Sequence, residues 1–284
     1  MGTKDKQSKS EEKQPSRKHS NNTYATITDI CKIANNYQLT RQNYCHLCGT
    51  ALTKDNEIRS HILTRTTWMS PLLKGTKEKL LGLSIKGNFD PTHNITDNKI
   101  LCKSCDNNLS IYEQERENLL KEITGSNFEI KTGTIQIEGF NATRIKLAFL
   151  ADLYRCSITD IEIFNRISLG QKHEEKIKNL LLGIDKIEDP SVYSVILAKV
   201  KIPIDENGVS MMPIRCSRKV HKLNTYLMIL PRGWICIIKI DSQKNETIDN
   251  LSVDIVPSYT TLCDFTNERA SNFVTRLILS SIST

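Results

Sequence analysis

The sequence has no apolar run that approaches the length of a membrane-spanning helix. Such a helix needs about 20 consecutive apolar residues, whereas hydrophobic residues make up only 38% of the 284 positions and are interrupted throughout. The N-terminal residues also lack the apolar core of a secretory signal. We therefore expect a cytoplasmic protein that makes no membrane contact.

Aromatic residues are scarce, at 6% of the chain. No cluster of them forms the stacking platform with which proteins recognise single-stranded RNA, so an RNA target stays open without specific support. Residues 125–284 contain neither a glycine-rich phosphate loop nor the nucleophile elbow of serine hydrolases. The candidate chemistry therefore lies in the first half of the chain.

Cysteine, in contrast, is plentiful, with nine residues. Without a secretory signal we do not expect a disulfide framework, because a reducing compartment keeps thiols free or metal-bound. Cys45 and Cys48 form one Cys-x-x-Cys pair, Cys102 and Cys105 form another, and 53 residues separate the two pairs. Each pair places two thiolates on a tight turn, which is half of a tetrahedral zinc site. The four cysteines together predict a structural Zn²⁺ ion.

The net charge of +7 is spread thinly, but one segment is locally basic. Between residues 59 and 103, eight basic residues face three acidic ones. A basic insertion between two zinc turns suits contact with nucleic-acid phosphates, which is largely electrostatic. We predict phosphate contacts from Arg59, Arg65, Lys99 and Lys103. The alternative is a solvated, lysine-rich loop without a ligand.

The composition divides the chain into three segments. Residues 1–24 are mostly Lys, Ser, Gln, Glu and Asn and should form a disordered, mildly basic tail. Residues 25–124 carry the cysteine pairs and should form a small zinc-stapled domain. In it we expect a short helix over 28–37, a strand over 58–63, a loop over 82–98, and a helix after Cys105 with a capping box of Ser110 and Glu113.

The third segment, residues 125–284, changes from helical to strand patterns. We expect a hairpin around Gly133 and helices over 144–154, 161–167 and 174–182. Beyond residue 192 the apolar period is two, which predicts strands over 192–202, 214–216, 226–230, 234–240 and 251–256, before a helix over 267–282. The fold class is therefore α+β, with a helical segment and then an antiparallel-sheet domain that recognises a substrate or partner.

The order of motifs in the first domain resembles a known family. A Cys-x-x-Cys pair, a strand that ends in His61 and a second pair that opens a helix are similar to the HNH (ββα-metal) endonucleases of the four-cysteine type, which have a treble-clef-like fold. The Ser-His-Ile sequence at residues 60–62 resembles a divergent branch of that family, and the likeness covers roughly residues 40–124.

The resemblance implies a role for each matching residue. The four cysteines would hold the structural zinc, and His61 would be the general base that activates water. Asn98, or Asp97 beside it, would orient His61. Asp106 or Asn107 would bind a catalytic Mg²⁺ or another divalent cation. In the divergent branch an arginine after the histidine and a glutamate in the next helix are common, and the equivalents here are Arg65, Glu113 and Glu115.

The implied activity is hydrolysis of DNA phosphodiester bonds, often in phage defence or in mobile elements. The sequence departs from the family at Ser60, where an acidic metal ligand is usual, and at Thr64, where proline is common. A serine hydroxyl is a poor ligand for a hard divalent cation. The alternative is therefore a catalytically inactive zinc-binding module that binds DNA or a protein partner, and a homodimer stays open.

Overall fold

The computed structural model describes residues 44–63, 80–83, 89–92, 95–125, 133–200, 211–216, 222–230, 233–256 and 258–267, together with 272, 275 and 276. The chain divides into two compact units, Met1–Thr40 and Arg41–Thr284, and the described residues all belong to the second. The predicted tail over 1–24, the predicted helix over 28–37 and most of the predicted helix over 267–282 lie outside the described residues.

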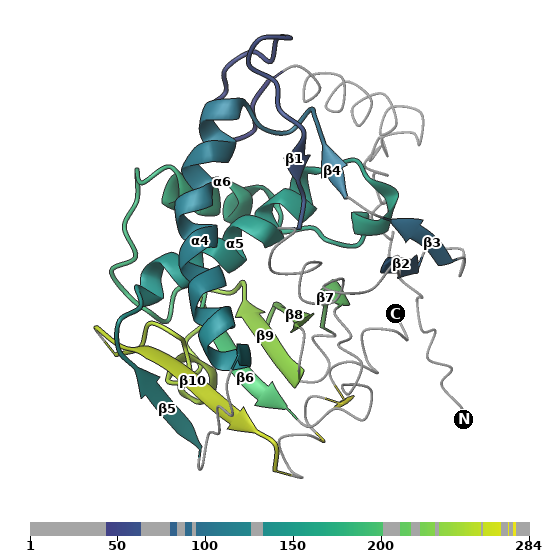
Figure 1. The fold of residues 1–284 in the computed structure, drawn as a ribbon. Coiled ribbons are helices and arrows are strands. Elements are labelled where there is room, and N and C mark those ends of the chain that lie inside the picture. Colours follow the sequence, from purple (N-terminus) through teal and green to yellow (C-terminus); the bar gives the residue numbers. More distant parts are fainter. Residues whose placement is uncertain are drawn as a thin grey trace, which may run out of the picture. The chain divides into compact units, whose positions relative to one another are not determined.

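Two pairs of short strands follow the first cysteine pair (Figure 1). Strand β1 (Ser60–His61) pairs antiparallel with β4 (Thr96–Asp97), so the predicted strand over 58–63 is reduced to two residues. Strands β2 (Leu80–Leu83) and β3 (Phe89–Thr92) form an antiparallel hairpin that overlaps the segment predicted as a loop. Glycine and Asp-Pro occur in the turns of hairpins as well as in loops. The sequence pattern therefore did not distinguish a hairpin from a loop.

Helix α4 (Lys103–Gly125) begins between the two cysteines of the second pair. Its residues Leu109, Leu119 and Ile123 are buried at helical spacing and fix the face that points to the core. The predicted capping box is wrong because the helix begins before Ser110, whose hydroxyl instead donates to the Asn107 carbonyl at 2.5 Å.

Helix α5 (Ala142–Ile158) is buried almost all round, with every residue from 145 to 156 buried. The side chain of Asn141 caps its first turn by accepting a hydrogen bond from the Arg144 backbone N–H at 3.0 Å. Helix α6 (Gln171–Leu181) follows, and the predicted helix over 161–167 is a single 3₁₀ turn, η1 (Glu162–Phe164).

The second half of the chain builds a six-stranded sheet in the order β5-β10-β6-β9-β8-β7. Its strands are β5 (Thr134–Ile137), β6 (Val195–Val200), β7 (Met211–Arg215), β8 (Thr225–Leu230), β9 (Trp234–Lys239) and β10 (Thr260–Phe265). The sheet is mixed rather than antiparallel, because β10 runs parallel to β6. The segment over 251–256 forms turns, not the predicted strand, and follows the short helix α8 (Glu246–Asp249).

Both faces of the sheet are buried, with alternate residues of each strand on opposite sides. Val195 and Leu197 of β6 pack with helices α4, α5 and α6, while Ile196 and Ala198 belong to a second cluster on the other face. The helix-side cluster also contains Cys45 of the first cysteine pair. The cysteine pairs and the sheet therefore share one hydrophobic core.

Candidate metal centre

The four predicted zinc ligands converge, although 53 residues separate the two pairs. The sulfur atoms of Cys45, Cys48, Cys102 and Cys105 all lie within 4.8 Å of one another. Tetrahedral Zn–S bonds of about 2.3 Å place two sulfurs about 3.8 Å apart, and the Cys48 and Cys102 sulfurs lie 3.7 Å apart. The donor set and its spacing fit a metal ion such as zinc.

Backbone hydrogen bonds hold each cysteine turn. The Gly49 N–H donates to the Cys45 carbonyl at 2.8 Å, and Gly49 has a φ of 73°, a conformation that glycine adopts without strain. The Asp106 N–H donates to the Cys102 carbonyl at 3.0 Å as helix α4 begins. The His46 N–H donates to the Ile100 carbonyl at 2.9 Å and so ties the two turns together.

The thiols of the cluster are electrostatically coupled. A hydrogen bond with the Cys105 side chain lowers the pKa of Cys45 to about 4, and the same interaction, with burial, raises the pKa of Cys105. Burial also raises the pKa of Cys102. One thiolate is thus stabilised by neighbouring thiols, whereas four adjacent thiolates would repel one another. A bound cation offsets that repulsion and displaces the remaining protons.

His61 and Asp106 lie on different elements, β1 and α4. His61 is half-buried on β1, opposite Thr96 of β4. Its neighbour Ser60 is fully buried and donates its hydroxyl proton to Asp106 Oδ1 at 2.5 Å. This hydrogen bond joins β1 to the first turn of α4, which also carries Cys105. Ser60, which precedes the predicted general base His61, is therefore hydrogen-bonded to Asp106, which follows the fourth cysteine.

The other candidates of the resemblance lie around this contact. Asn98 is exposed just after β4, and no hydrogen bond within the described part of the chain joins its side chain to His61. Asp97 instead accepts hydrogen bonds from the Thr159 hydroxyl at 2.7 Å and from the Lys99 backbone N–H at 2.9 Å. Asn107 is exposed on α4. Neither Asp97 nor Asn98 is held against the imidazole by a hydrogen bond.

Three of the predicted phosphate-contact residues are exposed in the described part of the chain. Arg59 donates from Nε to the Thr96 hydroxyl at 2.7 Å, so its guanidinium lies over the β1–β4 pair. Lys99 follows β4, and Lys103 is the first residue of α4. Arg65 lies outside the described residues. Arg59 and Lys99 therefore flank the same small sheet that carries His61.

Glu113 and Glu115, the glutamates that match the divergent branch, form contacts between helices. Glu113 forms an ion pair with the buried Arg155 of α5, and Arg155 also pairs with Asp152 at 3.2 Å. Asp152 in turn pairs with Arg116 of α4 at 2.7 Å. Glu115 accepts a hydrogen bond at 2.7 Å from the backbone N–H of Asn141, the residue that caps α5. These contacts join α4 to α5.

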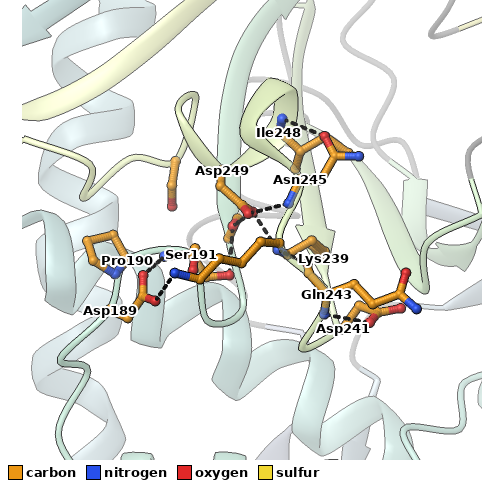
Figure 2. Close-up of polar contacts among 12 residues, drawn as sticks. Asp189, Pro190, Ser191, Lys239, Asp241, Gln243, Asn245, Ile248 and Asp249 are labelled. Carbon is orange, nitrogen blue, oxygen red and sulfur yellow. Dashed lines mark hydrogen bonds and ion pairs between the residues drawn. The ribbon is translucent and has the colours of Figure 1, made fainter.

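A second buried polar cluster lies at one end of the sheet (Figure 2). Lys239 Nζ is 2.5 Å from Asp249 Oδ1, which also accepts the Ser194 hydroxyl proton at 2.5 Å. The neighbouring Lys146 pairs with Asp254 at 3.0 Å, and burial lowers the pKa of Lys146. Each of these charges has an oppositely charged partner, so the cluster joins α5, β9 and α8 rather than presenting a reactive group.

A pocket of about 370 Å³ adjoins the candidate site and was not predicted from the sequence. His46, Asp97, Asn98, Lys99 and Asp160 supply its polar lining. Asp160 follows α5 and lines the pocket together with Ile158 and Ile161, whereas the other lining residues come from the first cysteine turn and from residues 96–100. No spacing in the sequence relates it to the cysteine pairs, so only the packing of α5 against the cysteine turns reveals this site.

Comparisons of the chain with protein-family models, with curated proteins and with solved structures found no match. None of the helices among the described residues combines the length and apolar character that crossing a membrane requires. Fold and site together define a mixed α+β protein with a four-cysteine cluster that could hold a metal ion such as zinc.

Proposed function

We propose that this protein is a zinc-stapled, HNH-like endonuclease that hydrolyses DNA phosphodiester bonds. The observation that carries the proposal is the contact of Ser60 with Asp106, at 2.5 Å, directly beside His61 and the cysteine cluster. It joins a short strand to the first turn of a helix that also carries Cys105, and this contact supports the proposal of a ββα-metal site.

His61 is the proposed general base, because it lies half-buried on β1 and histidine is the side chain that most often serves as a general base. Asp106 is the proposed carboxylate ligand of a Mg²⁺-class cation. Such a cation is commonly held by one or two carboxylates together with substrate phosphate oxygens, and it stabilises the charge that develops on the phosphate. Arg59 and Lys103 would attract the nucleic-acid backbone.

A catalytically inactive zinc module that binds DNA or a protein partner is the second candidate. It is favoured by the complete burial of Ser60, whose hydroxyl proton already occupies one oxygen of Asp106. A cation at this place has to displace that hydrogen bond and gains only a weak hydroxyl ligand in return.

A plasmid-cleavage assay with Mg²⁺ or Mn²⁺ tests the proposal. Wild-type protein, the His61→Ala variant and a control variant, His173→Ala on α6, are compared after their bound zinc has been quantified. We expect cation-dependent cutting by the wild type and the control, and a loss of at least about 100-fold in His61→Ala, as for removal of a general base. Equal zinc in all three proteins without cutting by any of them supports the binding module.

The Ser60→Asp variant separates the two candidates further. If the scaffold is a nuclease with a weakened cation site, restoring a carboxylate beside His61 increases the cleavage rate at low Mg²⁺ concentration. The Ser60→Asn variant, which introduces a side chain of similar size without a charge, is the matched control. No gain in the aspartate variant over the asparagine variant speaks against a cation site at Ser60 and Asp106.

A further inference from the structure

The pocket beside β4 is rigidly built. Its wall at Asp97 is fixed by the hydrogen bonds from Thr159 and from the Lys99 backbone, at 2.7 Å and 2.9 Å. The cysteine turn at His46 is also fixed, because the Tyr154 hydroxyl donates to the His46 carbonyl at 3.0 Å. Neither side depends on a ligand for its position, so the pocket exists before anything binds.

The lining of the pocket combines apolar side chains with polar groups of different kinds. Ile161 is half-buried and, with the largely buried Ile100 and Ile158, supplies the apolar part of the lining. The exposed side chains of Asn98, Lys99 and Asp160 supply an amide, an ammonium group and a carboxylate. The group of His46, Asp97 and Asp160 is not among the candidate metal clusters of the described residues, where only the four cysteines converge closely enough.

We infer that this pocket takes up one unpaired nucleobase of the bound nucleic acid. Proteins hold an extruded base against apolar side chains and read its edge with hydrogen bonds. Amide and carboxylate groups pair with base edges, which carry both donors and acceptors. Two carboxylates, those of Asp97 and Asp160, disfavour a phosphate inside the pocket, whereas Lys99 and the nearby Arg59 suit phosphates at its rim.

The pocket also lies next to the proposed catalytic residue. Thr96 and Asp97, which line it, are the strand partners of His61 and Ser60. Neighbouring strands lie about 5 Å apart, so a base in the pocket places its own phosphates close to β1. The inference rests on the proposed nucleic-acid substrate and specifies its form: a strand with an unpaired base beside the bond that is cut.

Fluorescence anisotropy without added divalent cation tests the inference. The probes are a labelled DNA duplex with a single-nucleotide bulge and the same duplex fully paired. We expect wild-type protein to bind the bulged duplex about tenfold more tightly, as one well-made set of base contacts allows. Asn98→Ala and Asp160→Asn should remove most of this preference. Asp185→Asn, an exposed aspartate outside the pocket, is the control and should keep it.

Equal affinity of the wild type for the two probes, or a preference that survives in both pocket variants, overturns the inference. Absence of binding to either probe overturns it as well. The plasmid-cleavage assay distinguishes this failure from failure of the proposed nuclease. If the protein cuts DNA but binds both probes equally, the proposed nuclease activity stands and the nucleobase pocket is rejected. If the protein prefers the bulged duplex but does not cut DNA, the nucleobase pocket stands and the nuclease activity is rejected.

Discussion

At the scale of single residues, the cysteine cluster depends on sulfur atoms that come from two turns. Cys102 is buried at the start of α4, and its sulfur faces that of the exposed Cys48. Because a structural zinc site is held by all four ligands and contributes to folding, loss of one ligand affects both metal content and stability.

We expect Cys102→Ser protein to lose its bound zinc and to unfold at a lower temperature. Zinc per chain by mass spectrometry and thermal unfolding followed by circular dichroism check this. The control is Cys156→Ser, which replaces a buried cysteine of α5 that lies outside the cluster and should leave the zinc in place. A Cys102→Ser protein with a full zinc complement would contradict the assignment.

The buried aspartate between α4 and α5, Asp152, allows a second prediction about a single residue. Asp152 is fully buried and pairs with both Arg116 and Arg155. Asp152→Asn leaves two buried guanidinium groups with less negative charge, and breaking such a buried pair costs about 3–5 kcal/mol of unfolding free energy. Urea unfolding measures the loss. The exposed Asp185→Asn serves as control, and a cost as small as that of the control would show that the pairing does not stabilise the fold.

At the scale of elements, helix α5 organises the molecule because it touches both the cysteine turns and the sheet. The hydroxyl of Tyr154 reaches the first cysteine turn, and Lys146 reaches the buried cluster at the end of the sheet. The near-continuous apolar run of α5 made this helix predictable. The partners of its few polar residues could not be predicted, because they depend on how the helix packs against the rest of the chain.

The cap of α5 provides a test at this scale. The Asn141 side chain satisfies a backbone N–H of the first turn, and its loss in Asn141→Ala should cost about 1 kcal/mol of unfolding free energy. The backbone bond from Asn141 to Glu115 is unaffected by the change. Chemical unfolding compared with Asn165→Ala, an exposed asparagine that follows η1, checks the expectation. Equal stability of the two variants would argue against a role for the cap.

The strand predictions show where sequence patterns fail. Strands β8 and β9 were predicted nearly in full from their apolar pattern, although both are buried at every position rather than at alternate ones. The segment over 251–256 alternates apolar Leu251, Val253 and Ile255 with polar Ser252 and Asp254, yet it forms turns. Its Val253 donates to the Val195 carbonyl at 2.8 Å and accepts from the Thr261 N–H at 2.9 Å. Val253 thus forms hydrogen bonds with the sheet from within a turn. The next strand, β10, begins only at Thr260.

At the scale of the whole molecule, stability depends on charges buried between distant segments. Burial by itself raises the pKa of Asp249, but hydrogen bonds from Lys239, Ser194 and the Asn245 backbone outweigh it, so the pKa lies below its ordinary value. The ordinary aspartate pKa is about 3.9. The stability that Asp249 contributes is therefore present above about pH 4 and is lost as the pH falls through the lowered pKa.

We expect the difference in unfolding free energy between wild type and Asp249→Asn to be large at neutral pH and to narrow below about pH 4. The unfolded wild-type chain takes up a proton at this site before the folded one does, whereas the asparagine cannot titrate. Urea unfolding at a series of pH values measures the difference. Asp185→Asn should show no comparable narrowing, and a constant difference for Asp249→Asn would refute the linkage.

The sequence by itself determined the cysteine pairs, the mixed helix and strand content and the placement of His61 on a strand, because these follow from local spacing and periodicity. Only the tertiary structure decided that the four sulfurs meet, that Ser60 bonds to Asp106, that β10 runs parallel to β6, and that Asp160 completes a pocket beside β4. Each of these joins residues distant in the chain, and such contacts are fixed by the packing of the shared core.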